Sequence, residues 1–430
     1  MSQPPSAPDD DESTAEVVTR LWADRDLASM LGGAARAMSA GSATDWGMPA
    51  PLAAAPPPIT LGGGIPDPET LPREELLKAL GRVLGEPGDG PLRYGGALGY
   101  EPLREAIAER SAHAWGIPLG AAHVMLTNGS AGAIDVICST LIDPGDVIVV
   151  EAPTFSGSVR TFRGHSAEIV SVPVDRDGMD VEALATVLAG LAAGGRRAKL
   201  VYTVSNYHNP TGVTLSLDRR HRLLRLAAEH GALVLDDDAY GEIAFDEGRP
   251  PSLAALAGGR GVLTVGTFSK VIATGLRVGW IVADPALIDE MVSVRFDMGN
   301  SPLLHRMLAE YMGGGRLDAH VAEMRPVYGS RARALEDGLR EYAEPYLTFV
   351  RPRGGFFLWV RLQDGLTAPA VQRAAMEEGV AFPVGHAFFV ERGTEGDRHI
   401  RLAYSTRPEE ELREAARRIG RACERVATGG

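Results

Sequence analysis

The chain has 430 residues, of which 45% are hydrophobic and 23% are charged, as expected for a globular protein with two or three domains. These proportions exclude a wholly disordered chain, a fibrous repeat and a small disulfide-bonded scaffold. The net charge of −13 argues against a general nucleic-acid-binding surface, because such a surface needs a basic field.

The first 58 residues are rich in Pro, Ala, Ser and Asp, a composition typical of a partly flexible extension. Within residues 13–38 we predict one or two short helices, Val17–Leu31 and Ala34–Met38. The composition of Met48–Pro58 indicates a linker. We expect this extension to pack on the C-terminal domain.

Nothing in the sequence indicates export or a membrane span. The acidic N-terminus lacks the basic and apolar regions of a signal peptide, and the chain contains no run of 18 apolar residues. The two cysteines, Cys138 and Cys423, are far apart and lack metal-ligand spacing. We therefore expect a cytoplasmic protein without structural zinc.

From about residue 120, short apolar strands alternate with helical patterns. The predicted strands are His123–Thr127, Val147–Glu151, Ala167–Val174, Lys199–Val204, Leu233–Asp238, Val262–Ser269 and Arg277–Ala283. The predicted helices between them are Ala131–Leu141, Val181–Leu191 and Leu217–His230. Strands that are β-branched and apolar on both faces favour a covered, mostly parallel sheet. The fold class is therefore α/β and doubly wound, with its ligand beyond the carboxyl ends of the strands.

After Pro285 the pattern changes to a smaller α+β domain. A helical stretch, Ala286–Tyr342, contains a break at Gly313–Gly315. The elements predicted after it are strands Leu347–Arg351, Phe356–Arg361 and His399–Ala403 and helices Ala368–Glu378 and Glu409–Val426. We divide the chain into an N-terminal extension (1–58), a large domain (59–305) and a small domain (306–430).

Only three of the 43 basic residues are lysines: Lys78, Lys199 and Lys270. Where arginine has replaced lysine so widely, a remaining lysine can mark a need for an amine that loses its proton. Lys78 lies in an amphipathic helix pattern and Lys199 opens a strand, so surface positions explain both. Lys270 follows an apolar strand and precedes Val271 and Ile272, an environment that lowers the pKa of an amine.

Several segments around Lys270 are suited to binding an anion. Gly129, Ser130 and Ala131 pass from a strand into a helix, whose first N–H groups attract negative charge. Taken alone, this segment is equally consistent with an ordinary βα turn, and it matches neither G-x-G-x-x-G nor a Walker loop. Thr267, Ser269 and Arg277 add hydroxyl groups and a guanidinium.

Three aspartates, Asp236 to Asp238, end a buried strand just before Tyr240. Carboxylates at that place are costly unless they meet partners, so three of them indicate a site. Another strand ends in Asn209-Pro-Thr-Gly, which taken alone is also a plain turn.

In this order, the motifs resemble the class I/II pyridoxal-phosphate aminotransferases of fold type I. The matching segments are LGGGIPDPETLP, YGGALGYEPLREAIAER, NGSAGAIDV, DPGDVIVVEAPTF, NPTG, DDDAYGEI, GTFSKVIATGLRVGW, PRGGFFLWV and HIRLAYS. They span some 350 residues, from about Ile59 to Thr406. The sequence looks nearest to the subgroup with 2-aminoadipate and kynurenine aminotransferases and the effector domains of MocR-type regulators.

The resemblance implies a role for each matching residue around the cofactor, pyridoxal 5′-phosphate. Lys270 would form the Schiff base, and Asp237 would pair with the ring nitrogen. Tyr240 and Asn209 would hydrogen-bond the ring 3′-oxygen, and Phe155 would stack on the ring. The cofactor phosphate would be held by Ser130, Ala131, Thr267, Ser269 and Arg277.

The resemblance also implies a homodimer and a substrate site. Tyr94 would reach the phosphate of the other subunit. Arg401 would clamp the substrate carboxylate, with Asn209 nearby and with Gly63 and Gly64 lining that end of the site. Taken singly, Phe155 fits a core residue, Arg401 a surface ion pair and Tyr94 a loop residue; only the ordered set favours a site. Arg36 and Trp46 are further guesses at substrate contacts.

The implied reaction transfers the α-amino group of an L-amino acid to a 2-oxo acid. The sequence departs from its relatives at Ala131, where Gln is frequent, at Ser205, where Pro is frequent, and in the turn 384–388. These changes leave open another reaction on an amino acid such as S-adenosylmethionine: elimination, replacement or carbon–carbon bond formation. A non-enzymatic domain that senses the cofactor is a third reading. It is disfavoured because the acidic, Pro-rich segment of 58 residues before Ile59 is too short for a DNA-binding domain and carries the wrong charge.

Overall fold

The structure, a computed structural model, describes residues 13–23, 25–39, 47–49, 57–246, 250–391 and 393–429. The chain divides into two compact units, Met1–Ser42 and Ala43–Gly430. Trp46 and most of the predicted linker lie outside the described residues. Along the described chain, no helix is both long and apolar enough to cross a membrane.

The described residues of the first unit form helices α1 (Thr14–Ala23) and α2 (Gly33–Ser39), with a 3-10 turn at Leu27–Met30 between them. The sequence pattern predicted one continuous helix up to Leu31. Instead, Asp26 begins a separate turn, because its carboxylate accepts a hydrogen bond from the Ala28 N–H at 3.0 Å.

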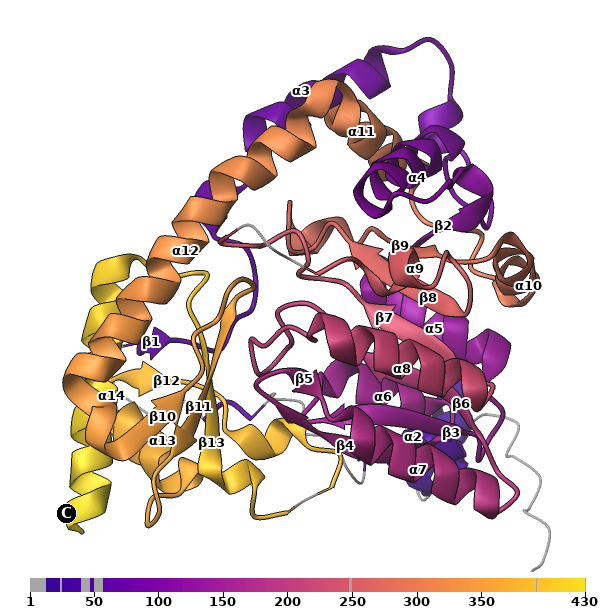
Figure 1. The fold of residues 1–430 in the computed structure, drawn as a ribbon. Helices are drawn as coiled ribbons and strands as arrows, with labels where there is room; N and C mark the ends of the chain where they lie inside the picture. Colours follow the sequence, from indigo (N-terminus) through magenta and orange to yellow (C-terminus); the bar gives the residue numbers. More distant parts are fainter. Residues whose placement is uncertain are drawn as a thin grey trace, which may run out of the picture. The chain divides into compact units, whose positions relative to one another are not determined.

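An eight-stranded sheet lies at the centre of the second unit, in the order β2-β9-β8-β7-β6-β3-β4-β5 (Figure 1). Its strands are β2 (Val124–Thr127), β3 (Val147–Ala152), β4 (Glu168–Asp175), β5 (Gly178–Met179), β6 (Ala198–Thr203), β7 (Leu233–Asp237), β8 (Val262–Thr267) and β9 (Gly279–Val282). The five strands from β8 to β4 pair in parallel, whereas β5 and β9 pair antiparallel to their neighbours. The predicted mostly parallel α/β sheet is confirmed.

Both faces of the sheet are covered, because alternate residues of a strand point to opposite sides. Ile148 and Val150 of β3 belong to one buried cluster, which also contains Phe162 of α6. Val147 and Val149 belong to another. Helices on the first side are α5 (Gly129–Leu141) and α6 (Ser156–Gly164); those on the second are α7 (Val181–Ala193), α8 (Leu217–Glu229) and α9 (Leu253–Leu256).

The predicted helical stretch Ala286–Tyr342 is three helices: α10 (Pro285–Val294), α11 (Pro302–Met312) and α12 (Arg316–Ala343). The expected break at Gly313–Gly315 is present. A second break follows α10, where the guanidinium of Arg295 donates hydrogen bonds to the carbonyl of Ala97 and the side chain of Asn300. Helices α3 (Arg73–Gly85) and α4 (Glu101–Trp115) precede the sheet in the chain.

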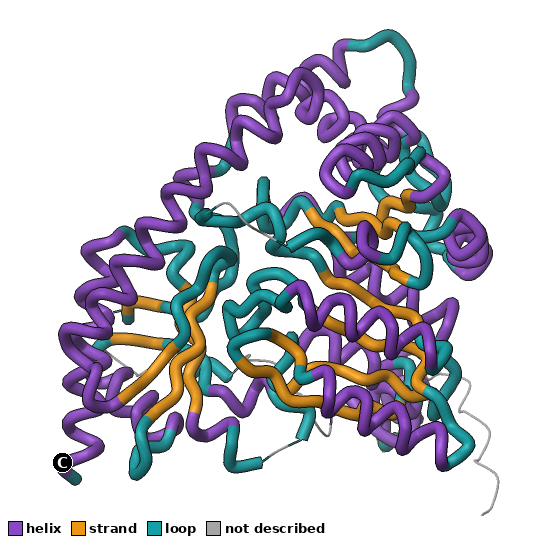
Figure 2. Tube along the Cα trace, viewed as in Figure 1, coloured by secondary structure: helices purple, strands orange, loops and turns teal. Residues whose placement is uncertain are grey.

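The C-terminal part is built on a three-stranded antiparallel sheet, β10-β11-β13, and a parallel pair, β1-β12. Its elements are β1 (Ile59–Thr60), β10 (Leu347–Phe349), β11 (Phe357–Leu362), α13 (Ala368–Glu377), β12 (Val380–Ala381), β13 (His399–Ala403) and α14 (Glu409–Thr428). Together with the second half of α12 they enclose a separate buried cluster. Figure 2 shows how purple helices border these orange strands.

Helix α12 contributes to two buried clusters. Leu317 and Met324, in its first half, belong to the cluster beside the large sheet. Leu335 and Leu339, in its second half, belong to the C-terminal cluster. This 28-residue helix, drawn in orange, extends from α11 to α14 (Figure 1).

Candidate active site

A cavity of about 180 Å³ lies where the parallel strands end, as the fold class predicts. Most of the residues predicted for the cofactor meet here. The lining residues are Ser130, Ala131, Phe155, Val204, Asn209, Asp237, Ala239, Tyr240, Ser269, Lys270, Thr274 and Arg277.

Lys270 lies just after β8 and borders this cavity. Its Nζ donates a 2.8 Å hydrogen bond to the carbonyl of Gly64 and lies 5.5 Å from the centre of the Tyr240 ring. Desolvation, helped by the positive charge of Arg401, lowers the pKa of Lys270 to about 8. The other two lysines have surface roles: Lys78 is exposed, and Lys199 contacts Asp146 at 3.2 Å.

Asp237, the last residue of β7, is buried and lines the same cavity as Lys270. Its Oδ2 accepts a 2.9 Å hydrogen bond from the hydroxyl of Tyr202, whereas its Oδ1 has no hydrogen-bond partner among the described residues. Burial raises the pKa of Asp237 to about 6, an effect that the Tyr202 hydrogen bond opposes. An unpaired buried carboxylate oxygen that faces a cavity indicates a missing donor.

The two neighbouring aspartates, Asp236 and Asp238, accept hydrogen bonds from residues that do not line this cavity. Asp236 accepts a 2.7 Å hydrogen bond from Ser205, and burial raises its pKa to about 7. Asp238 accepts a 2.7 Å hydrogen bond from Asn206. Of the three carboxylates that the sequence singles out, only that of Asp237 lines this cavity.

Several residues that the sequence predicts for an anion site lie together near the start of α5. Gly129 has a φ of +68°, and a Cβ there would collide with the guanidinium of Arg277. Arg277 donates hydrogen bonds to Ser269 Oγ at 3.3 Å and to the Thr274 carbonyl at 3.1 Å. The cavity thus has a guanidinium, a hydroxyl and the first turn of a helix at one end. Thr267 does not line it; its hydroxyl donates to Ser269 Oγ at 3.0 Å.

Phe155 lines the cavity from the start of α6. A Cβ on Gly157 would lie 2.6 Å from the Phe155 ring, so a residue without a side chain is needed there. On the other side, Tyr240 packs edge-on against Phe357, with ring centres 5.6 Å apart. These contacts hold the rings of Phe155 and Tyr240 in place at the cavity that Lys270 borders.

Arg401 lies outside the lining but contacts it through Asn209. The guanidinium donates to Asn209 Oδ1 at 2.9 Å and to the Gly62 carbonyl at 2.6 Å. It lies against the rings of Phe357 and Phe388, at 4.4 and 4.6 Å from their centres. Burial lowers the pKa of Arg401 to about 10.

The glycines that the sequence places near Arg401 differ in their roles. Gly64 accepts the Lys270 hydrogen bond, and a Cβ there would collide with the Phe357 ring. Gly63 accepts a 3.3 Å hydrogen bond from Ser405, and a Cβ there would make only ordinary contact. The packing of the chain therefore requires a residue without a side chain at Gly64 but not at Gly63.

Two other predicted residues lie away from this cavity. Tyr94 is 83% exposed in the single chain and does not line the cavity. Arg36 donates to the carbonyl of Leu31 within the first unit.

The sequence reasoning missed Tyr202 and Ser158, which are buried behind Asp237. The sequence signal for Tyr202 is a phenol that follows the apolar residues Leu200 and Val201 in a strand, and core packing explains it equally well.

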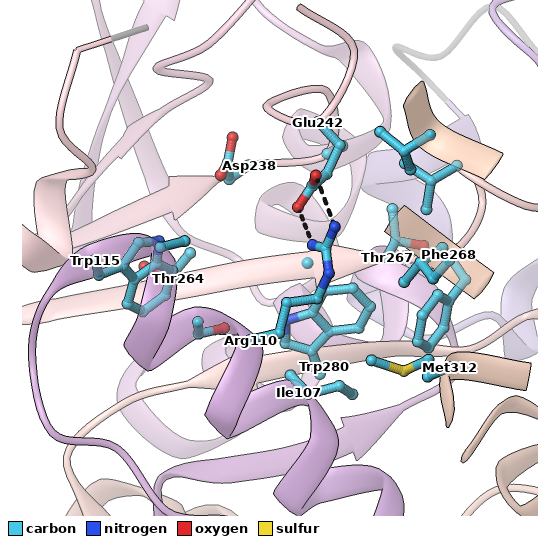
Figure 3. Close-up of a pocket in the computed structure, with 17 residues that line it drawn as sticks. Ile107, Arg110, Trp115, Asp238, Glu242, Thr264, Thr267, Phe268, Trp280 and Met312 are labelled. Carbon is cyan, nitrogen blue, oxygen red and sulfur yellow. Dashed lines mark hydrogen bonds and ion pairs between the residues drawn. The ribbon is translucent and has the colours of Figure 1, made fainter. Parts of the chain in front are cut away.

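Thr267 and Asp238 instead line a second, smaller cavity of about 70 Å³ (Figure 3). Arg110 of α4 borders it and forms an ion pair with Glu242, at 2.5 Å. Glu242 follows Tyr240 by two residues, so this ion pair ties the segment that carries Tyr240 to α4.

A family model for aminotransferase class I and II matches residues 59–419. Aromatic-amino-acid aminotransferase 1 of Thermococcus litoralis is 36% identical over 84% of this chain and 87% of its own length. The 2-aminoadipate transaminase of Thermus thermophilus is also 36% identical, over 85% of this chain and 89% of its own length. Other relatives are HTH-type transcriptional regulators.

The chain is also similar to the solved structure of the α-aminoadipate aminotransferase LysN from Thermus thermophilus, complexed with N-(5′-phosphopyridoxyl)-L-leucine. The TM-score is 0.83 at 32% identity, over 94% of this chain and all of that one.

The fold and these similarities define a pyridoxal-phosphate-dependent transferase of fold type I. The chain belongs to the aminotransferase class I and II family, and it is an aminotransferase. Its residues fit the cofactor: the Oδ1 atom of Asp237 has no donor within the described part of the chain, Lys270 supplies an amine of lowered pKa, and the α5 N-terminus with Arg277 suits a phosphate.

Proposed function

We propose that this aminotransferase transfers the α-amino group of an L-amino acid to a 2-oxo acid with Lys270 as the catalytic amine. The observation that carries the assignment of residues is that one cavity is lined both by Lys270 and by Asp237, whose Oδ1 atom has no hydrogen-bond partner among the described residues. When bound, pyridoxal phosphate supplies an aldehyde that forms a Schiff base with an amine, and a ring that withdraws electrons from the substrate α-carbon.

In this proposal Lys270 is both the nucleophile and the base. A pKa of about 8 leaves a larger neutral fraction near pH 7 than an ordinary lysine has, and the neutral amine is the form that reacts. Its position beside Tyr240 and the Gly64 carbonyl holds Nζ where it would take the proton of the substrate α-carbon. Tyr240 and Asn209 would hydrogen-bond the ring 3′-oxygen.

Asp237 would hold a proton on the ring nitrogen, because its carboxylate has one oxygen left for that donor. Phe155 would pack against the ring face. Arg277, Ser269, Thr267 and the N–H groups of Ser130 and Ala131 would bind the phosphate. Thr267 would act indirectly, because its hydroxyl donates a hydrogen bond to Ser269 Oγ and so holds the Ser269 side chain.

Arg401 would bind the substrate α-carboxylate with Asn209 beside it. The guanidinium is buried between two aromatic rings, where a charge-assisted hydrogen bond is strong. The backbone at Gly63 and Gly64 would border this end of the site. Aromatic amino acids and 2-aminoadipate are the first donors to test, because two relatives are named for them.

We also propose a homodimer in which Tyr94 contacts the phosphate in the partner's site. Support comes from large exposed side chains that a second copy would cover: Tyr94 is 83% exposed, Leu92 72% and Phe296 93%. The proposal of a separate small domain is supported by the C-terminal cluster, whose members on α12 begin at Ala332. The boundary at residue 305 stays a prediction. The cytoplasmic location stays a prediction.

The test is to supply the purified protein with pyridoxal phosphate and each donor, and to follow the cofactor spectrum. Transamination converts the bound aldehyde into pyridoxamine phosphate and releases an oxo acid. Borohydride reduction before donor is added should mark the peptide that contains Lys270. Release of ammonia, or of a substituent of the donor side chain, without pyridoxamine phosphate would favour elimination or replacement. Trapping at Lys78 or Lys199 would refute the assignment of Lys270.

A further inference from the structure

Tyr202 lies directly behind Asp237, on the side away from the cavity. It is on β6, in the centre of the sheet, and its side chain is completely buried. Its hydroxyl donates to Asp237 Oδ2 at 2.9 Å, and no water is needed to bridge the two groups. The contact is therefore a direct hydrogen bond between a phenol and a carboxylate.

The direction of that hydrogen bond is fixed by a third residue. Ser158 of α6 donates to the Tyr202 hydroxyl at 2.9 Å, and Ser158 is also buried. Because the phenol oxygen accepts this proton, its own proton is directed at Asp237. Phe162, also on α6, packs edge-on against the Tyr202 ring, with centres 5.3 Å apart, and prevents the ring from turning away.

We propose that Tyr202, oriented by Ser158, is a positioning residue that holds Asp237 ionised and turns its free Oδ1 atom toward the cofactor ring nitrogen. The inference rests on the proposed function, since it concerns the carboxylate assigned there to the ring. It adds two residues that touch neither cofactor nor substrate and act only through Asp237.

Charge around Asp237 shows why such a partner matters. Asp238, on the same strand end, and Glu151 of β3 both disfavour the ionised form of Asp237, whereas Lys270 favours it. Burial disfavours it most, and the Tyr202 hydrogen bond is the largest opposing influence on its pKa. Without the phenol, a buried carboxylate between two like charges would bind a proton more readily.

The test compares two ligands that differ at one atom. Pyridoxamine 5′-phosphate carries the ring nitrogen; in its 1-deaza analogue a C–H group replaces that atom. Dissociation constants of both are measured by fluorescence quenching for the unmodified chain, Tyr202→Phe and Ser158→Ala. Tyr404→Phe is the matched control, because Tyr404 is a completely buried phenol that hydrogen-bonds backbone groups of Gly354 and Phe357 rather than Asp237.

We expect Tyr202→Phe to weaken binding of pyridoxamine phosphate about tenfold, as loss of one charge-assisted hydrogen bond would, and to change binding of the analogue less than twofold, about the reading error. Ser158→Ala should also weaken binding of pyridoxamine phosphate more than binding of the analogue, but by less than tenfold. Tyr404→Phe should leave both dissociation constants unchanged. Equal losses for both ligands in Tyr202→Phe would show a merely structural role, and no loss for either would refute the inference.

The proposed function has its own readout in the same experiment. If the unmodified chain fails to bind pyridoxamine phosphate, the assignment of the cavity fails. If it binds that ligand better than the analogue but Tyr202→Phe keeps the difference, only the role of Tyr202 fails. Thermal unfolding of each variant shows whether it is folded before its constants are compared.

Discussion

The guanidinium of Arg401 donates a 2.9 Å hydrogen bond to the side-chain oxygen of Asn209, although 192 residues separate the two in the chain. Arg401 lies on β13 in the C-terminal part, and Asn209 follows β6 of the large sheet. The hydrogen bond therefore ties the proposed substrate clamp to the proposed cofactor site.

Replacing Arg401 by Lys should weaken binding of the amino donor. A lysine keeps the charge but loses the planar pair of donors that reaches Asn209 and a carboxylate together. We expect KM for the donor to rise about 10- to 100-fold with a smaller change in kcat, as measured by initial rates. Arg417→Lys on the surface of α14 is the control, since Arg417 contacts only Glu414 in the recorded ion pairs. An unchanged KM in Arg401→Lys would contradict the clamp.

Lys270→Ala should lose at least about 10³-fold in kcat, because nucleophile and base are removed together. Lys78→Ala and Lys199→Ala are natural controls, since these are the other two lysines of the chain. Neither should lose activity by more than about twofold, given their surface contacts. Full activity in Lys270→Ala would remove the basis of the proposed function.

Asp236→Asn should change how stability depends on pH. The pKa of Asp236 is raised from an ordinary value near 3.8 to about 7 in the folded chain, so the folded chain binds a proton there more tightly than the unfolded chain does. The resulting contribution to stability is complete below about pH 4 and is lost as the pH rises through 7. The Asn variant has no such loss. The Tm of the variant minus that of the parent should therefore rise by about 2–4 °C from pH 4 to pH 7.

The groups facing Asp236 are Ser205, Arg220, Asp237 and Asp238, and all remain in that variant. Asp218→Asn on α8 is the control, because its carboxylate is exposed in the folded chain. A Tm difference that stays constant with pH for Asp236→Asn would contradict the buried ionisation.

The dimer proposal predicts complementation between two inactive variants. Lys270→Ala and Tyr94→Ala chains are each assayed alone and after being unfolded and refolded together. If Tyr94 acts on the partner's site, each mixed dimer has one intact site, so random mixing restores about a quarter of full activity. Should Tyr94 act within its own chain, mixing would restore none. Sedimentation velocity on the unmodified chain checks that it is a dimer.

Much of the sheet was predictable, because β3 and β6 to β9 are apolar runs separated by turn residues. The two-residue strands β5 and β12 were not, since each exists only through its pairing with another strand, β4 or β1. The break after α10 was hidden for the same reason: it depends on Arg295 meeting the carbonyl of Ala97, far away in the sequence.

In the site, residues with a distinctive motif around them were predictable, such as Lys270 in its strand-end segment. The hydrogen bond of Thr267 to Ser269, which takes its hydroxyl away from the cavity lining, was not predictable, because it depends on the rotamer of one side chain. Tyr202 was missed because a tyrosine in an apolar strand has the same pattern whether it packs or positions a carboxylate. The separation of Asp236 from Asp237 follows from strand alternation, but which of them meets the cavity is set by tertiary packing.

Helix α12 has a mechanical consequence. Its 28 residues span about 42 Å, and its two halves are anchored in different buried clusters. Because one continuous helix is anchored in both clusters, they cannot move apart unless the helix bends. Their relative movement is therefore restricted to a small hinge-like rotation. Pro326, which removes one hydrogen bond near the middle of the helix, is where that bending would concentrate.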